Sequence, residues 1–217
     1  MKLRIDSPII TMGIKLTNLA ILNLYWIIGC LPIVTIGAST IAAYTVTLKM
    51  TEDGDDDGIT VQFWKAFAGN LKHGVPLTLI LLAGVWSIWL DWQMFDKLEG
   101  NPIGFLMIAL VLIFLLVIHF LYVFPLEARY ENRMFKNLSN AQVMFVRFFG
   151  RSVGLVGALF LQFLFFTQVN NALRLIGVFC MPILMIYTVS KTAMPLFRAI
   201  EGGGDIDDDV TLPSDLY

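Results

Sequence analysis

Two acidic stretches hold most of the carboxylates that could bind a cation. The run DGDDDG at residues 53–58 matches the opening of an EF-hand-like calcium loop, in which alternating carboxylates coordinate the ion. The twelfth position of such a loop should offer a bidentate carboxylate, but here it is Trp64. A solvated acidic loop therefore explains the run better than a calcium site. The second stretch, residues 201–217, is expected to be an acidic cytoplasmic tail.

A cluster of tryptophans lies beside carboxylates in residues 86–101, a combination that could hold a sugar. Trp86, Trp89 and Trp92 recur at close spacing, with Asp91 among them. The alternative is an aromatic belt, because tryptophan gathers where a membrane meets water. The belt is the stronger interpretation, since such tryptophans are ordinary at the end of a membrane segment.

Three polar side chains lie inside apolar stretches and are candidates for polar packing between helices: Asn23, His119 and Gln162. An ionisable residue within a membrane is a functional candidate by default. His119, however, has no acidic neighbour at helical spacing, and amides in membrane helices usually hydrogen-bond to a neighbouring helix. We expect all three to be packing residues. The sequence offers no ligand set for a metal ion and predicts no cofactor.

Basic residues gather in two segments near the middle of the chain. The stretch PLEARYENRMFKN at residues 125–137 predicts a charged helix with its basic side chains on one face. That face could contact anionic lipid head groups or a cytoplasmic partner, and a solvated helix is equally compatible with the pattern. The candidate contacts, including two from the segment that follows, are Arg129, Arg133, Lys136, Arg147 and Arg151.

Charge and motif content exclude several classes of function. The net charge is −2, so the chain carries no basic field for nucleic acid. The sequence has no Ser-His-Asp arrangement, no glycine-rich phosphate loop and no paired carboxylates within an apolar stretch. We therefore do not expect an enzyme.

The elements that must position these residues are membrane helices. Hydrophobic residues make up 57% of the 217 residues and charged residues only 15%, whereas a soluble domain has about 25% charged residues. The charges are segregated, which leaves apolar stretches close to the roughly 20 residues that span a bilayer. We predict a single all-α domain, a polytopic membrane bundle of five to six segments. The expected segments are about 16–34, 36–50, 74–92, 101–125, 152–169 and 174–197.

The first apolar stretch, residues 16–48, is too long for one straight crossing. As a helix it would extend about 50 Å at ~1.5 Å per residue, whereas the hydrocarbon core is ~30 Å thick. Pro32 and Gly37 lie near its middle, and Pro182 lies in the last stretch; all three are candidate hinges or turns. Two interpretations remain open: a tight hairpin, or one crossing followed by a kinked interfacial helix.

Counts of lysine and arginine favour the hairpin. Basic residues collect on the cytoplasmic side of membrane proteins. With a hairpin and both termini inside, 13 of the 15 lysines and arginines lie inside, and only Lys97 and Arg174 lie outside. A single crossing with the N-terminus outside moves Lys2, Arg4 and Lys15 to the other side. We therefore favour six segments with both termini in the cytoplasm.

Two amphipathic segments are expected to lie in the cytoplasmic interface. Residues 58–74 place Val61, Trp64 and Leu71 on one helical face, and residues 140–152 show a similar pattern. Each segment precedes a pair of spans, which predicts helical hairpins with interfacial lead-in helices. The order could reflect an internal repeat, although such lead-ins are common in membrane proteins.

Three stretches carry a family resemblance: NLYWIIGCLPIVTIGASTIAAY, FWKAFAGN and YVFPLEARYEN. In the first, Asn23, Trp26, the Leu31–Pro32 pair and residues 35–37 follow one another in a specific order and spacing. These stretches resemble the YesL-like family of bacterial integral membrane proteins, a domain of unknown function. The similarity runs over roughly residues 14–200, and the two acidic stretches depart from it.

The resemblance implies a bacterial plasma membrane protein with a carbohydrate-linked role, because members are often encoded beside sugar-uptake transporters and polysaccharide-degrading enzymes. It supplies no catalytic residues. The leading hypothesis is an accessory or regulatory protein that contacts the lipid bilayer and a sugar-uptake transporter complex. The alternative is a small-solute transporter or channel, whose signature would be broken helices near the middle of the membrane.

Overall fold

The computed structural model describes residues 8–52, 58–95, 103–130, 134–168 and 171–201. Within these ranges the secondary structure is helical and contains no strand. Six of the described segments are long and apolar enough to cross a membrane, by length and composition. The all-α polytopic class expected from the sequence is confirmed.

The helices follow one another with short connections. In chain order they are α1 (Pro8–Cys30), the 3-10 helix η1 (Ile33–Thr35), α2 (Ile36–Glu52), α3 (Ile59–Phe95), α4 (Ile103–Ile118), the π-helix η2 (His119–Val123), α5 (Phe124–Arg129), α6 (Met134–Arg147), α7 (Phe149–Gln168) and α8 (Asn171–Glu201). Because α4, η2 and α5 join end to end, they form one helical run from Ile103 to Arg129.

The first apolar stretch folds as a hairpin of α1 and α2, as the charge counts favoured. The backbone of Pro32 is extended, with φ −77° and ψ 115°, and a proline disfavours helix at the residue before it. Helix α1 therefore ends at Cys30. The Thr35 hydroxyl closes the turn by donating to the carbonyls of Gly29 and Pro32, each at 2.7 Å.

Gly37 lies outside this turn, in the first turn of α2, so the expectation of a turn at Gly37 is wrong. It instead allows α2 to cross α3 at backbone distance. A Cβ on Gly37 would collide with the carbonyl oxygen of Gly74, and a Cβ on Gly74 would collide with the backbone of Ala38. The Thr78 hydroxyl bridges the crossing: it accepts from the Gly37 N–H at 2.7 Å and donates to the Gly74 carbonyl at 2.9 Å. Small residues permit such close approaches of membrane helices.

Helix α2 is the centre of the bundle and packs against α1, α3, α5 and α8. Ile41, Ala42 and Tyr44 are fully buried. The Thr47 and Ser190 hydroxyls hydrogen-bond between α2 and α8 at 2.7 Å, also in the interior. This packing explains why α2 is rich in alanine and threonine: its neighbours are other helices, and small side chains let them approach.

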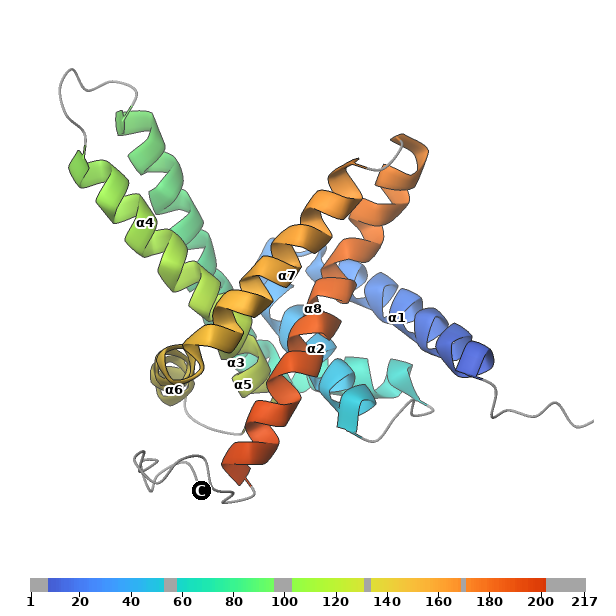
Figure 1. The fold of residues 1–217 in the computed structure, drawn as a ribbon. Coiled ribbons are helices and arrows are strands. Elements are labelled where there is room, and N and C mark those ends of the chain that lie inside the picture. Colours follow the sequence, from blue (N-terminus) through green and yellow to red (C-terminus); the bar gives the residue numbers. More distant parts are fainter. Residues whose placement is uncertain (1–7, 53–57, 96–102, 131–133, 169–170, 202–217) are drawn as a thin grey trace, which may run out of the picture.

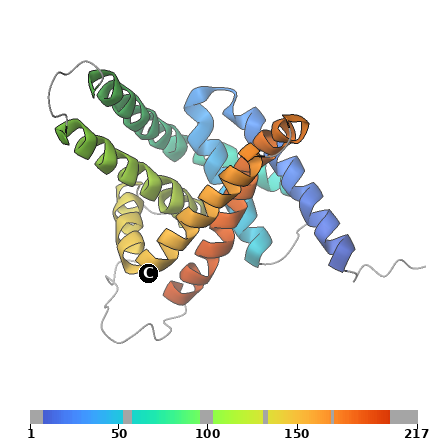
Figure 2. The ribbon, with the colours of Figure 1, turned by 45° about the horizontal axis from the view of Figure 1, so that its top comes forward.

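Two hairpins, α3–α4 and α7–α8, diverge from the end of the bundle that carries α5 and α6 (Figure 1). Figure 2 shows the same separation from another direction. A groove of about 490 Å³ between them is lined by apolar side chains of α3, α4, η2, α7 and α8. The hairpins therefore present apolar surfaces of the kind that lipid tails or another membrane helix can contact.

The expected lead-in helix at 58–74 and the span after it form one helix, α3, which changes direction in Figure 1 between its cyan and green parts. Pro76 lies inside α3, and prolines are a common cause of such bends. The face expected to lie in the membrane interface is not the one that packs inside the protein. Phe63 is fully buried, with its ring 5.9 Å from that of Tyr25, whereas Val61 is 71% exposed.

The charged helix expected over 125–137 is not continuous. Helix α5 ends at Arg129, because Tyr130 is extended with φ −117° and ψ 129°. Helix α6 begins at Met134, and the residues between lie outside the described ranges. The predicted alignment of basic side chains on one helical face therefore does not occur.

Pro182 lies inside α8, and the helix continues on both sides of it. A proline removes one backbone hydrogen bond from a helix but does not end this one, so Pro182 does not form a turn, and its role as a hinge stays a prediction. The helical turn before Pro182 is hydrogen-bonded to α1, because the Asn23 amide donates to the Phe179 carbonyl at 2.6 Å.

Candidate functional site

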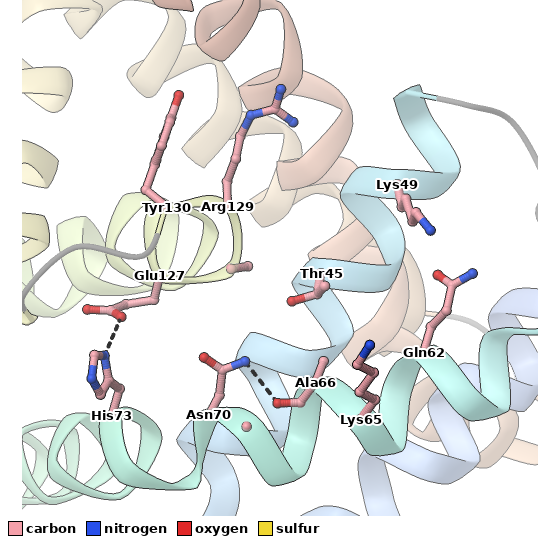
Figure 3. Close-up of a pocket in the computed structure, with 12 residues that line it drawn as sticks. Thr45, Lys49, Gln62, Lys65, Ala66, Asn70, His73, Glu127, Arg129 and Tyr130 are labelled. Carbon is pink, nitrogen blue, oxygen red and sulfur yellow. Dashed lines mark hydrogen bonds and ion pairs between the residues drawn. The ribbon is translucent and has the colours of Figure 1, made fainter. Parts of the chain in front are cut away.

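A polar pocket of about 660 Å³ opens where α2 and α5 end and the first half of α3 passes between them. Its lining residues are Thr45, Lys49, Gln62, Lys65, Ala66, Gly69, Asn70, His73, Glu127, Ala128, Arg129 and Tyr130. Figure 3 shows the lysines at one side of the pocket, His73 and Glu127 at the other, and Asn70 between them. In the topology predicted from the lysine and arginine counts, this end of the bundle faces the cytoplasm.

One wall of the pocket is an imidazole–carboxylate pair. His73 Nδ1 lies 3.1 Å from Glu127 Oε2, and the side chains are 41% and 2% exposed, respectively. A buried carboxylate needs a donor, and His73 can meet that need from Nδ1, which leaves Nε2 at the other side of the ring as an acceptor. Glu127 Oε1 is buried and has no hydrogen-bond partner among the described residues. The pair thus holds the His73 ring in a fixed orientation at the pocket wall.

Asn70 and Thr45 add further acceptors to the pocket. The Asn70 Nδ2 group donates to the Ala66 carbonyl at 2.8 Å, and its amide oxygen points away from that helix in Figure 3. The Thr45 hydroxyl donates to the Ile41 carbonyl at 3.0 Å, so its oxygen can accept. These groups would receive hydrogen bonds from hydroxyl groups of a ligand.

The opposite side of the pocket is cationic. Lys49 lies in the last turn of α2 and Lys65 lies on α3, and both side chains are exposed at the pocket. A lysine ammonium acts as a compact point charge with three donors and is a common partner of phosphate. The pocket therefore has an accepting side and an anion-attracting side.

Arg129 lies at the edge of the pocket and is held by two glutamates. Its Nε and Nη2 donate to Glu201 at 2.7 and 2.8 Å, and its Nη1 and Nη2 donate to Glu52 at 3.1 and 3.2 Å. The Tyr130 hydroxyl donates to Glu201 at 2.8 Å. We call these four residues the Arg129 cluster. It joins the ends of α2, α5 and α8.

The Arg129 cluster changes the ionisation of the groups it contains. The Arg129 guanidinium holds the pKa of the Glu201 carboxyl below its ordinary value, against the opposing effect of partial burial. Burial, and then the hydrogen bond to Glu201, raises the pKa of the Tyr130 hydroxyl. Arg129 was expected to contact lipid or a partner; in the structure its guanidinium binds Glu52 and Glu201, and the outside contact stays a prediction.

The other basic candidates lie on α6, on α7 or outside the described ranges. Arg133 lies outside the described ranges. Lys136 is partly buried on α6 and Arg151 is exposed on α7. Arg147 stacks on the ring of the next residue at 5.6 Å, and its buried Nε and Nη1 have no hydrogen-bond partner in the described parts of the chain. The described candidates are divided between α6, which carries Lys136 and Arg147, and α7, which carries Arg151.

The three polar-packing candidates have different surroundings. Asn23 joins α1 to α8, as described above, and Gln162 joins α7 to α8 by accepting from the Thr188 hydroxyl at 3.4 Å. His119 is 3% exposed and packs edge-on against the Phe124 ring at 5.0 Å. Its Nε2 finds no hydrogen-bond partner in the described structure, so its main contact is aromatic.

The remaining candidate sites are on or beside α3. Residues 53–57 of the acidic run lie outside the described ranges, and the described residues contain no cluster of three or more His, Cys, Asp or Glu side chains that could hold a metal ion. Trp86 and Trp89 are exposed with ring centroids 4.9 Å apart, and Trp92 is exposed as well. Exposed rings at the end of a membrane helix are what an aromatic belt requires.

The pairs of residues that shape this end of the bundle were not predicted from the sequence, although Arg129 was a candidate by itself. His73 and Glu127 are separated by 54 positions, and Arg129 and Glu201 by 72. No local spacing indicates such pairs. One feature of the sequence could have indicated the first pair: Glu127 directly follows a long apolar run. A carboxylate beside a membrane segment usually needs a partner.

Comparison with known proteins gives one match. Residues 19–92 match a family described as protein of unknown function, DUF624. The matched stretch begins within α1, contains α2 and ends near the end of α3, so it includes the hairpin turn and the Gly37–Gly74 crossing. No curated protein and no solved structure matches the chain.

Proposed function

We propose that this multi-pass membrane protein is a non-catalytic accessory or regulatory component of a carbohydrate-uptake system in the bacterial plasma membrane. The carbohydrate link comes from the resemblance of its first hairpin, FWKAFAGN and YVFPLEARYEN to the YesL-like family. A sugar-uptake transporter is the expected partner. The match of residues 19–92 to a family of unknown function is compatible with this role.

The observation that carries an accessory role over a transport role is the packing of α2. An alternating-access transporter places its substrate among broken helices near the middle of the membrane. Here the central helix is continuous, and its middle residues Ile41, Ala42 and Ala43 are fully buried against neighbouring helices. The polar pocket is at one end of this packed region, where Thr45 and Lys49 of α2 line it.

A surface for a partner is available on α7. Gly150, Gly154 and Gly157 lie on one helical face, and a Cβ added to any of them meets nothing within 4 Å. Leu161 continues the same face and is 67% exposed. Faces of small residues let membrane helices pack closely, so a helix of the transporter could lie along α7.

Photo-cross-linking in native membranes tests this role. A photoreactive amino acid replaces Leu161 on α7 or, as a matched control, Leu106 on α4, which is also apolar and exposed. We expect an adduct with a transporter subunit from position 161 and none from position 106. Gly154→Leu should remove the adduct and lower uptake of the transported sugar. Identical adducts from both positions, or unchanged uptake after deletion of the gene, would contradict the proposal.

The alternative is a small-solute transporter or channel, and the polar pocket is the observation that favours it. Purified protein in proteoliposomes would then move a solute from a sugar panel faster than empty vesicles do. Flux that Lys65→Gln abolishes and Lys72→Gln preserves would support this alternative against the accessory role.

A further inference from the structure

We infer that the polar pocket between α2, α3 and α5 binds a phosphate ester of a polyol. The phosphate would lie against Lys49 and Lys65, and the hydroxyl groups would donate to His73 and Asn70. This inference does not depend on the accessory role, because it follows from the pocket itself.

The separation of charge across the pocket points to a ligand with two chemically different ends. Lys49 and Lys65 supply donors that attract an anion. The opposite side can supply acceptors, because a His73 ring that donates from Nδ1 to Glu127 has Nε2 left to accept, and its side chain is 41% exposed. Asn70 likewise uses its NH₂ group on the Ala66 carbonyl, which leaves its oxygen for a ligand. An inorganic anion would satisfy only the cationic side.

The buried carboxylate supports a ligand with hydroxyl groups. Glu127 is 2% exposed at its side chain, and its Oε1 lacks a partner among the described residues. A buried carboxylate of this kind is stabilised by additional donors close to it. A hydroxyl bound to His73 Nε2 would strengthen the His73–Glu127 hydrogen bond through the ring, since linked hydrogen bonds polarise one another.

Size and position are also compatible with this ligand. A volume of about 660 Å³ lies within the roughly 300–1,000 Å³ of small-molecule sites. The pocket lies between the end of α2, the end of α5 and the first half of α3, and the predicted topology puts it on the cytoplasmic side of the bundle. The same chemistry could therefore come from a soluble sugar or glycerol phosphate, or from the head group of phosphatidylglycerol.

Binding to the purified full-length protein tests the inference and separates the two sources. The soluble arm measures binding of glycerol 3-phosphate, inorganic phosphate and glycerol in detergent by calorimetry. The lipid arm measures retention of phosphatidylglycerol over phosphatidylcholine by mass spectrometry after extraction from mixed nanodiscs. We expect one arm to show binding, with glycerol 3-phosphate preferred over both inorganic phosphate and glycerol in the soluble case.

Matched variants assign the binding to the pocket. Lys65→Gln should weaken it by about ten-fold, as expected for loss of one charge-assisted contact, and Lys65→Arg should retain most of it. Lys72→Gln, at an exposed lysine of the same helix outside the pocket, should have no effect. Asn70→Ala should reduce the preference for glycerol 3-phosphate over inorganic phosphate.

Each outcome decides the question. If glycerol 3-phosphate binds to the unaltered protein and binding is lost in Lys65→Gln, the ligand is a free phosphate ester. If phosphatidylglycerol is retained and this retention is lost in Lys65→Gln, the ligand is a lipid head group. Either result supports the inference. Absence of both, or equal losses in Lys65→Gln and Lys72→Gln, overturns it. The binding experiment needs no partner protein, so a negative result would not contradict the accessory role. A negative cross-linking result would likewise not contradict the binding of a phosphate ester in the pocket.

Discussion

Arg129 joins the ends of three helices, because its guanidinium binds Glu52 of α2 and Glu201 of α8 while its own residue ends α5. Its side chain is 16% exposed, and those of the two glutamates are 36% and 39% exposed. A planar guanidinium can form paired hydrogen bonds to two carboxylates, which a lysine cannot. The type of residue 129 therefore matters for its geometry as much as for its charge.

Arg129→Gln should lower the stability of the purified protein by about 1 kcal/mol, since hydrogen bonds to partly exposed charged groups are lost. Thermal unfolding followed by size-exclusion fluorescence would measure the change. Arg151→Gln, at an exposed arginine of α7, is the control and should leave the unfolding temperature in place. Equal effects of the two substitutions would show that the cluster has no stabilising role.

Acid should loosen the end of α8. The pKa of Glu201 in the folded protein lies below its ordinary value of 4.5, mainly because of Arg129. The stabilisation from this pair is therefore complete above about pH 4.5 and is lost as the pH falls through the lowered pKa. Hydrogen-exchange protection of the last turn of α8 should decrease in that range. In Glu201→Gln the same turn should be less protected at neutral pH and should not respond further to acid.

The crossing of α2 and α3 shows what a helix needs beyond its hydrophobic pattern. Gly37 and Gly74 bring two backbones into contact, and Thr78 satisfies the polar groups exposed there. Hydrophobic periodicity predicted the helices, but not that α2 would be the central one. Contact between helices, rather than contact with lipid, explains its many small residues.

Gly74→Ala should destabilise the protein by about 1–3 kcal/mol, the usual range for overpacking a tight contact. The added Cβ would meet the backbone of Ala38, which can move only if the helices separate. Gly69→Ala is the matched control on the same helix, because a Cβ there meets nothing within 4 Å. It should be neutral or stabilise by up to about 1 kcal/mol from helix propensity. A thermal shift of the same sign in both variants would argue against the close crossing.

At the scale of the whole molecule, two apolar hairpins diverge around a packed central helix (Figure 1). A polar pocket is lined by α2, α3 and α5. Lys49, Lys65 and the Arg129 cluster are all at the same end of the bundle as this pocket. Basic residues concentrate on the cytoplasmic side of membrane proteins. The orientation with this end in the cytoplasm stays a prediction from the lysine and arginine counts.

Thiol labelling of intact cells would measure this orientation. Ile5→Cys or Val210→Cys is placed in a background that carries Cys30→Ala and Cys180→Ala, and the cells are treated with an impermeant thiol reagent. We expect both positions to be protected until the membrane is opened, because an α1–α2 hairpin returns the chain to the side on which it began. Labelling at position 5 alone would mean that the first stretch crosses the membrane once.

The sequence by itself determined the class of the protein and the approximate places of its helices. Long apolar stretches separated by charges predict membrane helices, because the bilayer requires length and apolarity, which are local properties. Pro32 predicted a break in the first apolar stretch for the same reason, since a proline affects its own backbone and that of its neighbour, and the lysine and arginine counts favoured a hairpin there. These features need no knowledge of what lies beside them in space.

The tertiary structure decided which of these residues meet. Gly37 became a crossing point instead of a turn because α3 packs onto it, and Arg129 became a link between helices because Glu52 and Glu201 come from distant segments. The polar pocket arose in the same way, from His73 and Glu127 on helices whose order in space no local pattern records. Contacts between residues far apart in the chain depend on the packing of the whole bundle, and this packing is the physical reason why the pocket could be found only in the folded protein.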